Sequence, residues 1–195
     1  MPSENGKSSS RLHFRAVVGK KVLIVGDVGT GKTRLTAALL DEAASSEWKD
    51  QITVVDMAPE IPAGHLQVGG RLTDYSQAAV LVRYLAPRHV HAPRLQGESK
   101  EQVLRLVKEN AETIDRLLVQ FLEAPTKVLF VNDVTLYLHS GNLSKIRQAL
   151  DAAETCIVNG YRGTKLREDR GSGVSRREEE ALSVLMKHVD QIVSL

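Results

Sequence analysis

Residues 20–33 read Lys-Lys-Val-Leu-Ile-Val-Gly-Asp-Val-Gly-Thr-Gly-Lys-Thr. The unbroken apolar run at 22–25 predicts a strand that is buried on both of its faces. Residues 34–46, which follow directly, carry leucine and alanine at helical spacing and predict a helix. The pattern Gly-x-x-x-x-Gly-Lys-Thr therefore lies between a strand and a helix, and in that context it forms a phosphate-binding loop.

The residue types of this loop suit a chain of phosphate groups. Successive backbone N–H groups, together with the N-terminus of the following helix, donate to an anion. Glycine permits a positive φ and lets the backbone approach a phosphate without a Cβ. Lys32 is predicted to reach the β- and γ-phosphates, and the Thr33 hydroxyl to bind Mg²⁺. The predicted nucleotide-binding residues of this stretch are Gly26, Asp27, Val28, Gly29, Thr30, Gly31, Lys32, Thr33 and Arg34.

At this motif the chain resembles the P-loop NTPase superfamily. Apolar strand segments alternate with helical segments along the rest of the chain, which predicts a three-layer α/β sandwich with a mostly parallel central sheet and RecA-like topology. Residues 1–10 are expected to form a disordered leader, and 11–195 a single nucleotide-binding domain. Strands are predicted at 22–25, 52–56, 127–131, 155–158 and 190–194, with a further candidate at 12–18, and helices at 76–86, 98–124, 143–153 and 175–188.

Acidic residues follow two of the predicted strands. Asp133 comes just after 127–131 and looks like a Walker B aspartate, which would hold Mg²⁺ together with Thr33; a turn or cap residue is the alternative. Asp56 ends the strand at 52–56, and Glu60 follows it within a long loop at 57–75. In RecA-like ATPases a carboxylate near this strand orients the attacking water, so the resemblance implies Glu60 as the catalytic base, with Asp56 as the alternative.

The nucleotide base and an arginine are predicted less directly. Asp56-Met-Ala-Pro lacks the glycine of the GTPase motif Asp-x-x-Gly, so ATP is the expected nucleotide. Tyr161, after the strand at 155–158, could stack on the adenine. Arg162 beside it is the first candidate for an arginine that stabilises charge on the γ-phosphate, and Arg71 is the second. The polar, glycine-rich stretch at 163–174 has the composition of a loop that could close over a ligand.

A weaker resemblance covers residues 127–195. This part runs as a strand, Asn132-Asp133, a helix, Ile157-Val-Asn-Gly-Tyr-Arg162, a helix and a last strand. It looks like the back half of RecA-like proteins that include ATP:corrinoid adenosyltransferases. The resemblance implies RecA-like topology, and it makes an ATP-dependent transferase an alternative to an ATPase.

Composition limits the other classes of function. The chain has 26 basic and 24 acidic residues, so its formal net charge is only +2, and nucleic-acid binding is not favoured. No apolar stretch is long enough to span a bilayer, and no membrane partner is expected. The single cysteine, Cys156, suits a reducing, cytoplasmic location. His89 and His91 have a spacing that can bind a metal ion, although the sequence offers no third ligand.

Three functions remain open at this point. The first is a Mg²⁺-dependent ATPase that drives or regulates a protein partner or another copy of itself, with Lys32, Glu60, Asp56 and Arg162 as the catalytic candidates. The second is an ATP-dependent transferase or kinase that acts on a small acceptor. The third is a binding module that responds to nucleotide without turning it over.

Overall fold

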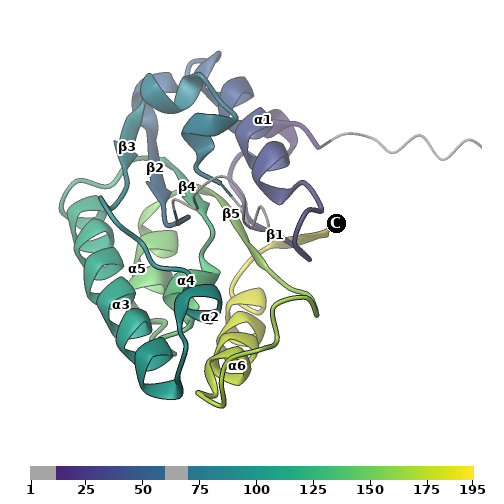
Figure 1. Cartoon of the computed structure of the whole chain (residues 1–195). Coiled ribbons are helices and arrows are strands. Elements are labelled where there is room, and N and C mark those ends of the chain that lie inside the picture. Colours follow the sequence, from purple (N-terminus) through teal and green to yellow (C-terminus); the bar gives the residue numbers. More distant parts are fainter. Residues whose placement is uncertain (1–11, 60–69) are drawn as a thin grey trace, which may run out of the picture.

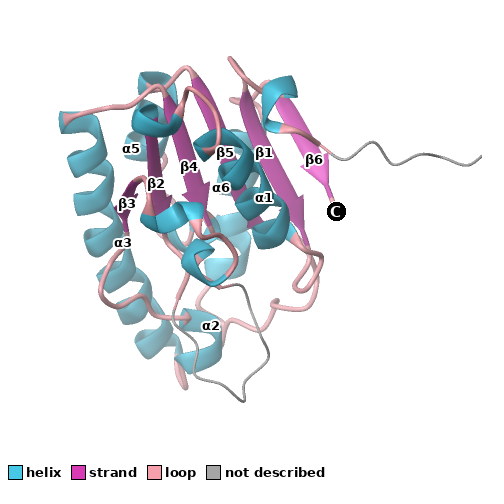
Figure 2. Cartoon of the chain, turned by 90° about the horizontal axis from the view of Figure 1, so that it is seen from above, coloured by secondary structure: helices cyan, strands magenta, loops and turns pink. Residues whose placement is uncertain are grey.

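A six-stranded parallel sheet forms the centre of the computed structural model, which describes residues 12–59 and 70–195 (Figure 2). The order of its strands is β3-β2-β4-β5-β1-β6. The prediction of a three-layer α/β sandwich with the topology of a RecA-like P-loop protein is therefore confirmed. The strands are β1 (Lys21–Gly26), β2 (Ile52–Asp56), β3 (Arg83–Leu85), β4 (Val128–Asn132), β5 (Thr155–Tyr161) and β6 (Gln191–Ser194).

Helices cover both faces of this sheet (Figure 1). One face carries α1 with short 3₁₀ turns, and the other carries α3, α5 and α6 with the short α4. Two four-residue helices, α2 and α4, lie in the connections around the candidate site. The helices are α1 (Lys32–Ala44), α2 (Pro93–Gln96), α3 (Lys100–Glu123), α4 (Thr135–Leu138), α5 (Ser144–Ala152) and α6 (Val174–Met186).

The apolar run of β1 shows how the core is divided. Side chains alternate along a strand, so Val22 and Ile24 pack toward α1, whereas Leu23 and Val25 pack toward α3, α5 and α6. All four side chains are at most 1% exposed. A strand that is apolar at every position is what a sheet covered on both faces requires, and this is why the run could be recognised in the sequence.

The parallel arrangement brings the carboxyl ends of distant strands together. Gly26, at the end of β1, is in register with Tyr161 of β5. Asp56, at the end of β2, is in register with Asn132 of β4. The loops that leave these strands therefore emerge at one edge of the sheet, where ligands bind in open α/β folds.

Two element predictions at the periphery are wrong. The segment at 12–18 is not a strand, because Phe14–Ala16 forms a 3₁₀ turn whose first N–H is bound by Glu42 of α1 at 2.7 Å. The segment at 76–86 is not a helix. It makes a 3₁₀ turn at Ala78–Val80 and then joins the sheet as β3, beside β2. In both cases a contact with a distant element outweighs the local pattern.

The start of α6 also differs from the prediction. The helix begins after Gly173, which takes a left-handed φ of +74° as N-cap. The first N–H groups of α6 donate to side chains of the preceding segment: Val174 N–H to Ser172 Oγ at 3.3 Å and Ser175 N–H to Asp169 Oδ2 at 3.0 Å. Ser175 and Glu178 have the spacing of a capping box in the sequence, but they do not form one. Glu178 instead turns into the protein, where it is buried.

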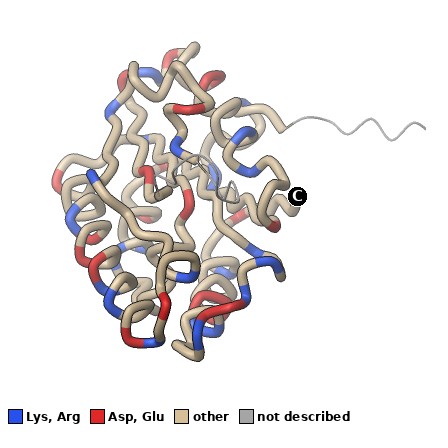
Figure 3. The backbone as a smooth tube through the Cα atoms, viewed as in Figure 1, with Lys and Arg blue, Asp and Glu red and all other residues tan. Residues whose placement is uncertain are grey.

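Positions of basic and acidic residues are interspersed along the backbone, and the formal net charge is only +2 (Figure 3). Among the described residues, no helix combines the length and apolar character needed to cross a membrane.

Candidate functional site

The predicted phosphate-binding loop joins β1 to α1 in a conformation that only glycine adopts easily. Gly29 has a φ of +82°, and Gly31, the N-cap of α1, has a φ of +93°. At Gly26, a Cβ would come within 2.6 Å of the Thr30 hydroxyl oxygen, so a larger residue would not fit the closed loop. Gly29 and Gly31 thus take the positive φ that the motif predicts, and the loop leads directly into the N-terminus of a 13-residue helix.

Polar contacts hold the loop in shape. The Lys32 ammonium group donates to the Asp27 carbonyl oxygen at 2.8 Å, bending back over the loop. Burial lowers the pKa of Lys32, although the carboxylates of Asp133 and Asp27 oppose this effect. The Asp27 side chain accepts from the backbone N–H groups of Val28, at 2.6 Å, and Thr164, at 3.1 Å. Burial would raise the pKa of Asp27, but these N–H groups outweigh it and lower the pKa.

A cavity of about 440 Å³ opens beside this loop. Its walls come from the loop, from α2, from the ends of β4 and β5, and from α4. Gly26 and Asp27 are not among the described residues that line it. The predicted site residues that do line it are Val28, Gly29, Thr30, Gly31, Lys32, Thr33, Arg34, Asp133 and Tyr161.

Asp133 lines the same cavity as Thr33, and it has an uncommon backbone conformation. Its φ is +56°, in the left-handed region, and its N–H donates to the Asn159 side-chain oxygen at 2.9 Å. The Thr135 hydroxyl donates to its carboxylate. Burial raises the pKa of Asp133, while Thr135 and then His139 and Lys32 oppose this rise. A carboxylate and a threonine hydroxyl that share one cavity are a donor set suited to Mg²⁺.

A buried chain of hydrogen bonds connects this acid to the helix that follows the loop. The Asn159 amide donates to the Thr36 hydroxyl at 2.9 Å and to the Asn132 side-chain oxygen at 2.8 Å. Thr36 in turn donates to the Lys32 carbonyl at 3.0 Å. Asn159 thus binds α1 and the backbone of Asp133 at once, and it fixes the separation between the phosphate loop and the acid. The sequence analysis did not identify this residue.

Asp56 has a different environment from the one expected of a catalytic base. Its side chain is 0% exposed and is not among the described residues that line the cavity. Its carboxylate accepts from Ala58 N–H, Leu72 N–H, the Tyr84 hydroxyl and the Asn132 amide, at 2.6–3.0 Å. The carboxylate therefore holds β2, β3, β4 and the segment after residue 70 together. Glu60, the other candidate base, lies outside the described residues.

The arginines are arranged differently from the prediction. Arg162 is exposed, and its backbone N–H donates to the Gly26 carbonyl at 3.0 Å. Arg71 donates to the Pro87 carbonyl at 2.7 Å. Neither is among the described residues that line the cavity, whereas Arg94 of α2 and Arg34 are. The sequence analysis missed Arg94 because α2 is too short to be recognised from periodicity.

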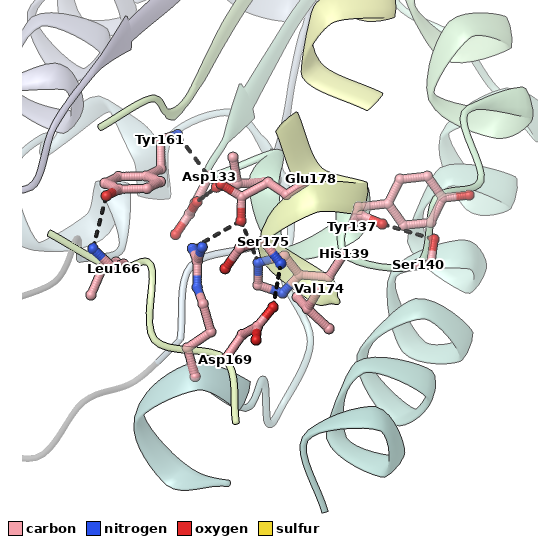
Figure 4. Close-up of polar contacts among 12 residues, drawn as sticks. Asp133, Tyr137, His139, Ser140, Tyr161, Leu166, Asp169, Val174, Ser175 and Glu178 are labelled. Atoms are coloured by element: carbon pink, nitrogen blue, oxygen red, sulfur yellow. Dashed lines mark hydrogen bonds and ion pairs between the residues drawn. The ribbon is translucent and has the colours of Figure 1, made fainter. Parts of the chain in front are cut away.

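Arg94 belongs to a group of side chains that we call the Arg94 cluster: Arg94, His139, Tyr161 and Glu178. Figure 4 labels the last three of these residues. One Glu178 oxygen forms an ion pair with the Arg94 guanidinium, 2.9 Å from its nearest nitrogen, and lies 2.7 Å from His139 Nε2. The guanidinium also lies 5.2 Å from the centre of the Tyr161 ring, a cation–π distance. The side chains of Arg94 and Glu178 are 8% and 6% exposed, so this ion pair is shielded from solvent.

The predicted histidine pair has another role. His91 Nε2 contacts a Glu109 carboxylate oxygen at 3.1 Å, which ties the segment before α2 to α3. Within the part of the chain that the structure describes, no group of three or more histidine, cysteine or acidic side chains could hold a metal ion.

Comparisons with known proteins add little beyond the fold. No protein-family model matches the chain, and no curated protein matches its sequence. Among solved structures, the chain is similar to a crystal structure of Pif1 helicase from Candida albicans, with a TM-score of 0.41 and 12% sequence identity. The match covers 93% of this chain and 37% of the helicase chain, so the present chain spans well under half of that protein. The strand order and the glycine loop define the fold as that of a P-loop NTPase.

Proposed function

We propose that this chain is a cytoplasmic, Mg²⁺-dependent ATP-binding protein that hydrolyses ATP and couples hydrolysis to a partner. The observation that carries the proposal is the shape of the loop from Gly26 to Thr33. Its left-handed glycines and the exposed start of α1 form an anion cradle at the mouth of a cavity of nucleotide-binding size.

The residues around the cradle fit the parts of a phosphoryl-transfer site. Lys32 would move from the Asp27 carbonyl to the β- and γ-phosphates, where its charge offsets theirs. Thr33 and Asp133 would hold Mg²⁺, which neutralises charge on the phosphate oxygens when it is bound. Asn159 would keep Asp133 at a fixed distance from α1.

Asp56 and Glu60 are the two candidates for the carboxylate that positions the attacking water. Asp56 is saturated with hydrogen bonds and buried away from the cavity, so Glu60 is the better of the two candidates. Arg94 lines the cavity and Arg162 does not, which makes Arg94 a better placed cation than the one chosen from the sequence.

A specific observation favours a second function, an ATP-dependent transferase that acts on a small acceptor. Besides the phosphate loop and its charged side chains, the cavity is lined by the Tyr161 ring and by apolar side chains from α2 and α4. Water attacking a phosphate needs no such surface, whereas an organic acceptor does.

Calorimetry on the purified chain tests the proposal. ATP with Mg²⁺ is expected to bind with a Kd in the micromolar range, about 8 kcal/mol of binding free energy. Lys32→Ala should weaken it about 100-fold, because a charge-assisted hydrogen bond is lost. Lys20→Ala, at an exposed lysine before β1, is the matched control and should leave the Kd unchanged. Unchanged ATP affinity in Lys32→Ala would refute the site.

Product analysis separates the two functions. Release of ADP and phosphate by the chain alone supports hydrolysis, and turnover that requires an added acceptor supports transfer. GTP titrated beside ATP tests the expected preference for adenine.

A further inference from the structure

The Arg94 guanidinium has donors to spare inside the cavity. The Glu178 carboxylate forms an ion pair with one of the guanidinium nitrogens, and the other guanidinium N–H groups have no hydrogen-bond partner among the described residues. These nitrogens are also not among the fully buried polar atoms that lack a partner, so they are open to the cavity that Arg94 lines. The contact with Tyr161 and the ion pair with Glu178 hold the side chain in place. Arg94 is thus fixed in position with part of its planar fork available to an oxyanion.

His139, in the same wall of the cavity, also has a polar atom without a hydrogen-bond partner among the described residues. Its side chain lines the cavity and is 1% exposed, and Nε2 faces the Glu178 carboxylate. Nδ1 is buried and has no partner in the described part of the chain. The donor and acceptor roles of the two ring nitrogens depend on the tautomer. Because Nδ1 is fully buried, the group that the cluster presents to a ligand is the Arg94 guanidinium.

The surface around these groups is apolar. Pro93 and Leu95 of α2, Leu136 of α4, and Leu166 line the same cavity, and the Tyr161 ring lies among them. A triphosphate offers no apolar group to such a surface. A molecule with one oxyanion and a carbon body fits both the charge and the lining better.

We propose that the Arg94 cluster forms a second subsite, which binds a small organic molecule bearing a carboxylate or phosphate group next to the nucleotide. The oxyanion contacts the free N–H groups of Arg94, and the carbon body packs on the apolar residues of α2 and α4. The inference rests on the proposed function in that it places this molecule beside a bound nucleotide. It locates the second ligand on α2, α4 and α6, with Leu166 as the contact from the stretch at 163–174.

The test is calorimetry on the full chain saturated with a non-hydrolysable ATP analogue and Mg²⁺. Malonate, benzoate and phenyl phosphate are the probes, which cover carboxylate and phosphate with and without a planar body. At least one is expected to bind with a Kd of about 1 mM or lower. Arg94→Met should weaken that probe at least about 10-fold. Arg105→Met, on the exposed side of α3, is the control and should change nothing.

A second variant and a comparison of nucleotides separate the possible outcomes of this test. Arg94→Lys preserves the ion pair with Glu178, so it folds even if Arg94→Met does not, and it should still weaken the probe because the planar fork is lost. The proposal is overturned if no probe binds, or if neither variant weakens it. It is also overturned if the Arg94 variants weaken the ATP analogue more than ADP, because Arg94 would then contact the γ-phosphate. If wild type binds no nucleotide, the proposed function fails. The probe titrations of the free protein then decide the subsite by the same criteria.

Discussion

The two walls of the cavity present different kinds of polar group. The phosphate-loop wall, residues 28–34, is one continuous stretch whose donors are backbone N–H groups around left-handed glycines. The Arg94 cluster is assembled from α2, the end of α4, β5 and α6, and its binding groups are side chains held by a shielded ion pair. Backbone donors recognise any phosphate chain and do not discriminate among its carriers. Selectivity for a particular second molecule is therefore expected of the Arg94 cluster.

The largest effect is expected from a substitution that disrupts the Arg94 cluster and leaves the phosphate loop unchanged. Glu178→Ala removes the carboxylate shared by Arg94 and His139, and it should lower the free energy of unfolding by about 3–5 kcal/mol, since a buried cation loses its partner. Glu180→Ala, two residues along α6 at an exposed pair with Arg176, should leave it nearly unchanged. Urea unfolding measures both. Equal effects in the two variants would mean that the Arg94 ion pair is not structural.

The second prediction concerns a substitution that distorts the phosphate-loop wall. Gly31→Val places a β-branched residue at a φ of +93°, and the displaced loop should bind ATP about 100-fold more weakly, a loss of roughly 3 kcal/mol. Gly141→Val imposes similar strain at a φ of +77°, away from the cavity. Calorimetry beside thermal melting separates binding from stability. The account is contradicted if both variants bind ATP alike.

A smaller effect is expected where the two walls meet. Asp133→Asn removes the charge that is proposed to hold Mg²⁺ with Thr33, so the gain in ATP affinity on adding Mg²⁺ should fall about 10-fold. Affinity measured in EDTA should stay the same as wild type. Titrations with and without Mg²⁺ give the comparison. A Mg²⁺ effect of wild-type size would remove Asp133 from the metal site.

The smallest effect concerns the stretch at 163–174, which the sequence suggested as a closing loop. Lys165 reaches the loop only through an exposed contact with the Val28 carbonyl at 3.3 Å. Lys165→Ala should therefore change ATP affinity by no more than about twofold. A loss beyond tenfold in the same titration would assign this segment a direct part in nucleotide binding.

The same contrast explains which features the sequence could predict. The strand at 22–25, the glycine loop and α1 are contiguous, and each has a pattern that backbone chemistry dictates. Asp133, which lines the cavity, could also be chosen from the sequence, because it directly follows a buried strand. Arg94 and Glu178 come from elements that are far apart in the sequence, and no local pattern marks either residue as part of a site.

The errors have a related cause. Asp56 follows a strand as Asp133 does, yet it is a structural residue, because three of its four hydrogen-bond donors come from distant segments. Ser175 and Glu178 have the spacing of a capping box, but the left-handed Gly173 begins the helix and Arg94 pairs with Glu178. Local spacing does not reveal whether a polar side chain turns outward or into the core.

A crystal structure of the chain with a non-hydrolysable ATP analogue and Mg²⁺ tests the central claim most directly. The account predicts the phosphates against the backbone of residues 29–33, with the Lys32 ammonium group moved onto them and the metal between Thr33 and Asp133. Nucleotide bound elsewhere, with Lys32 still on the Asp27 carbonyl, would contradict it.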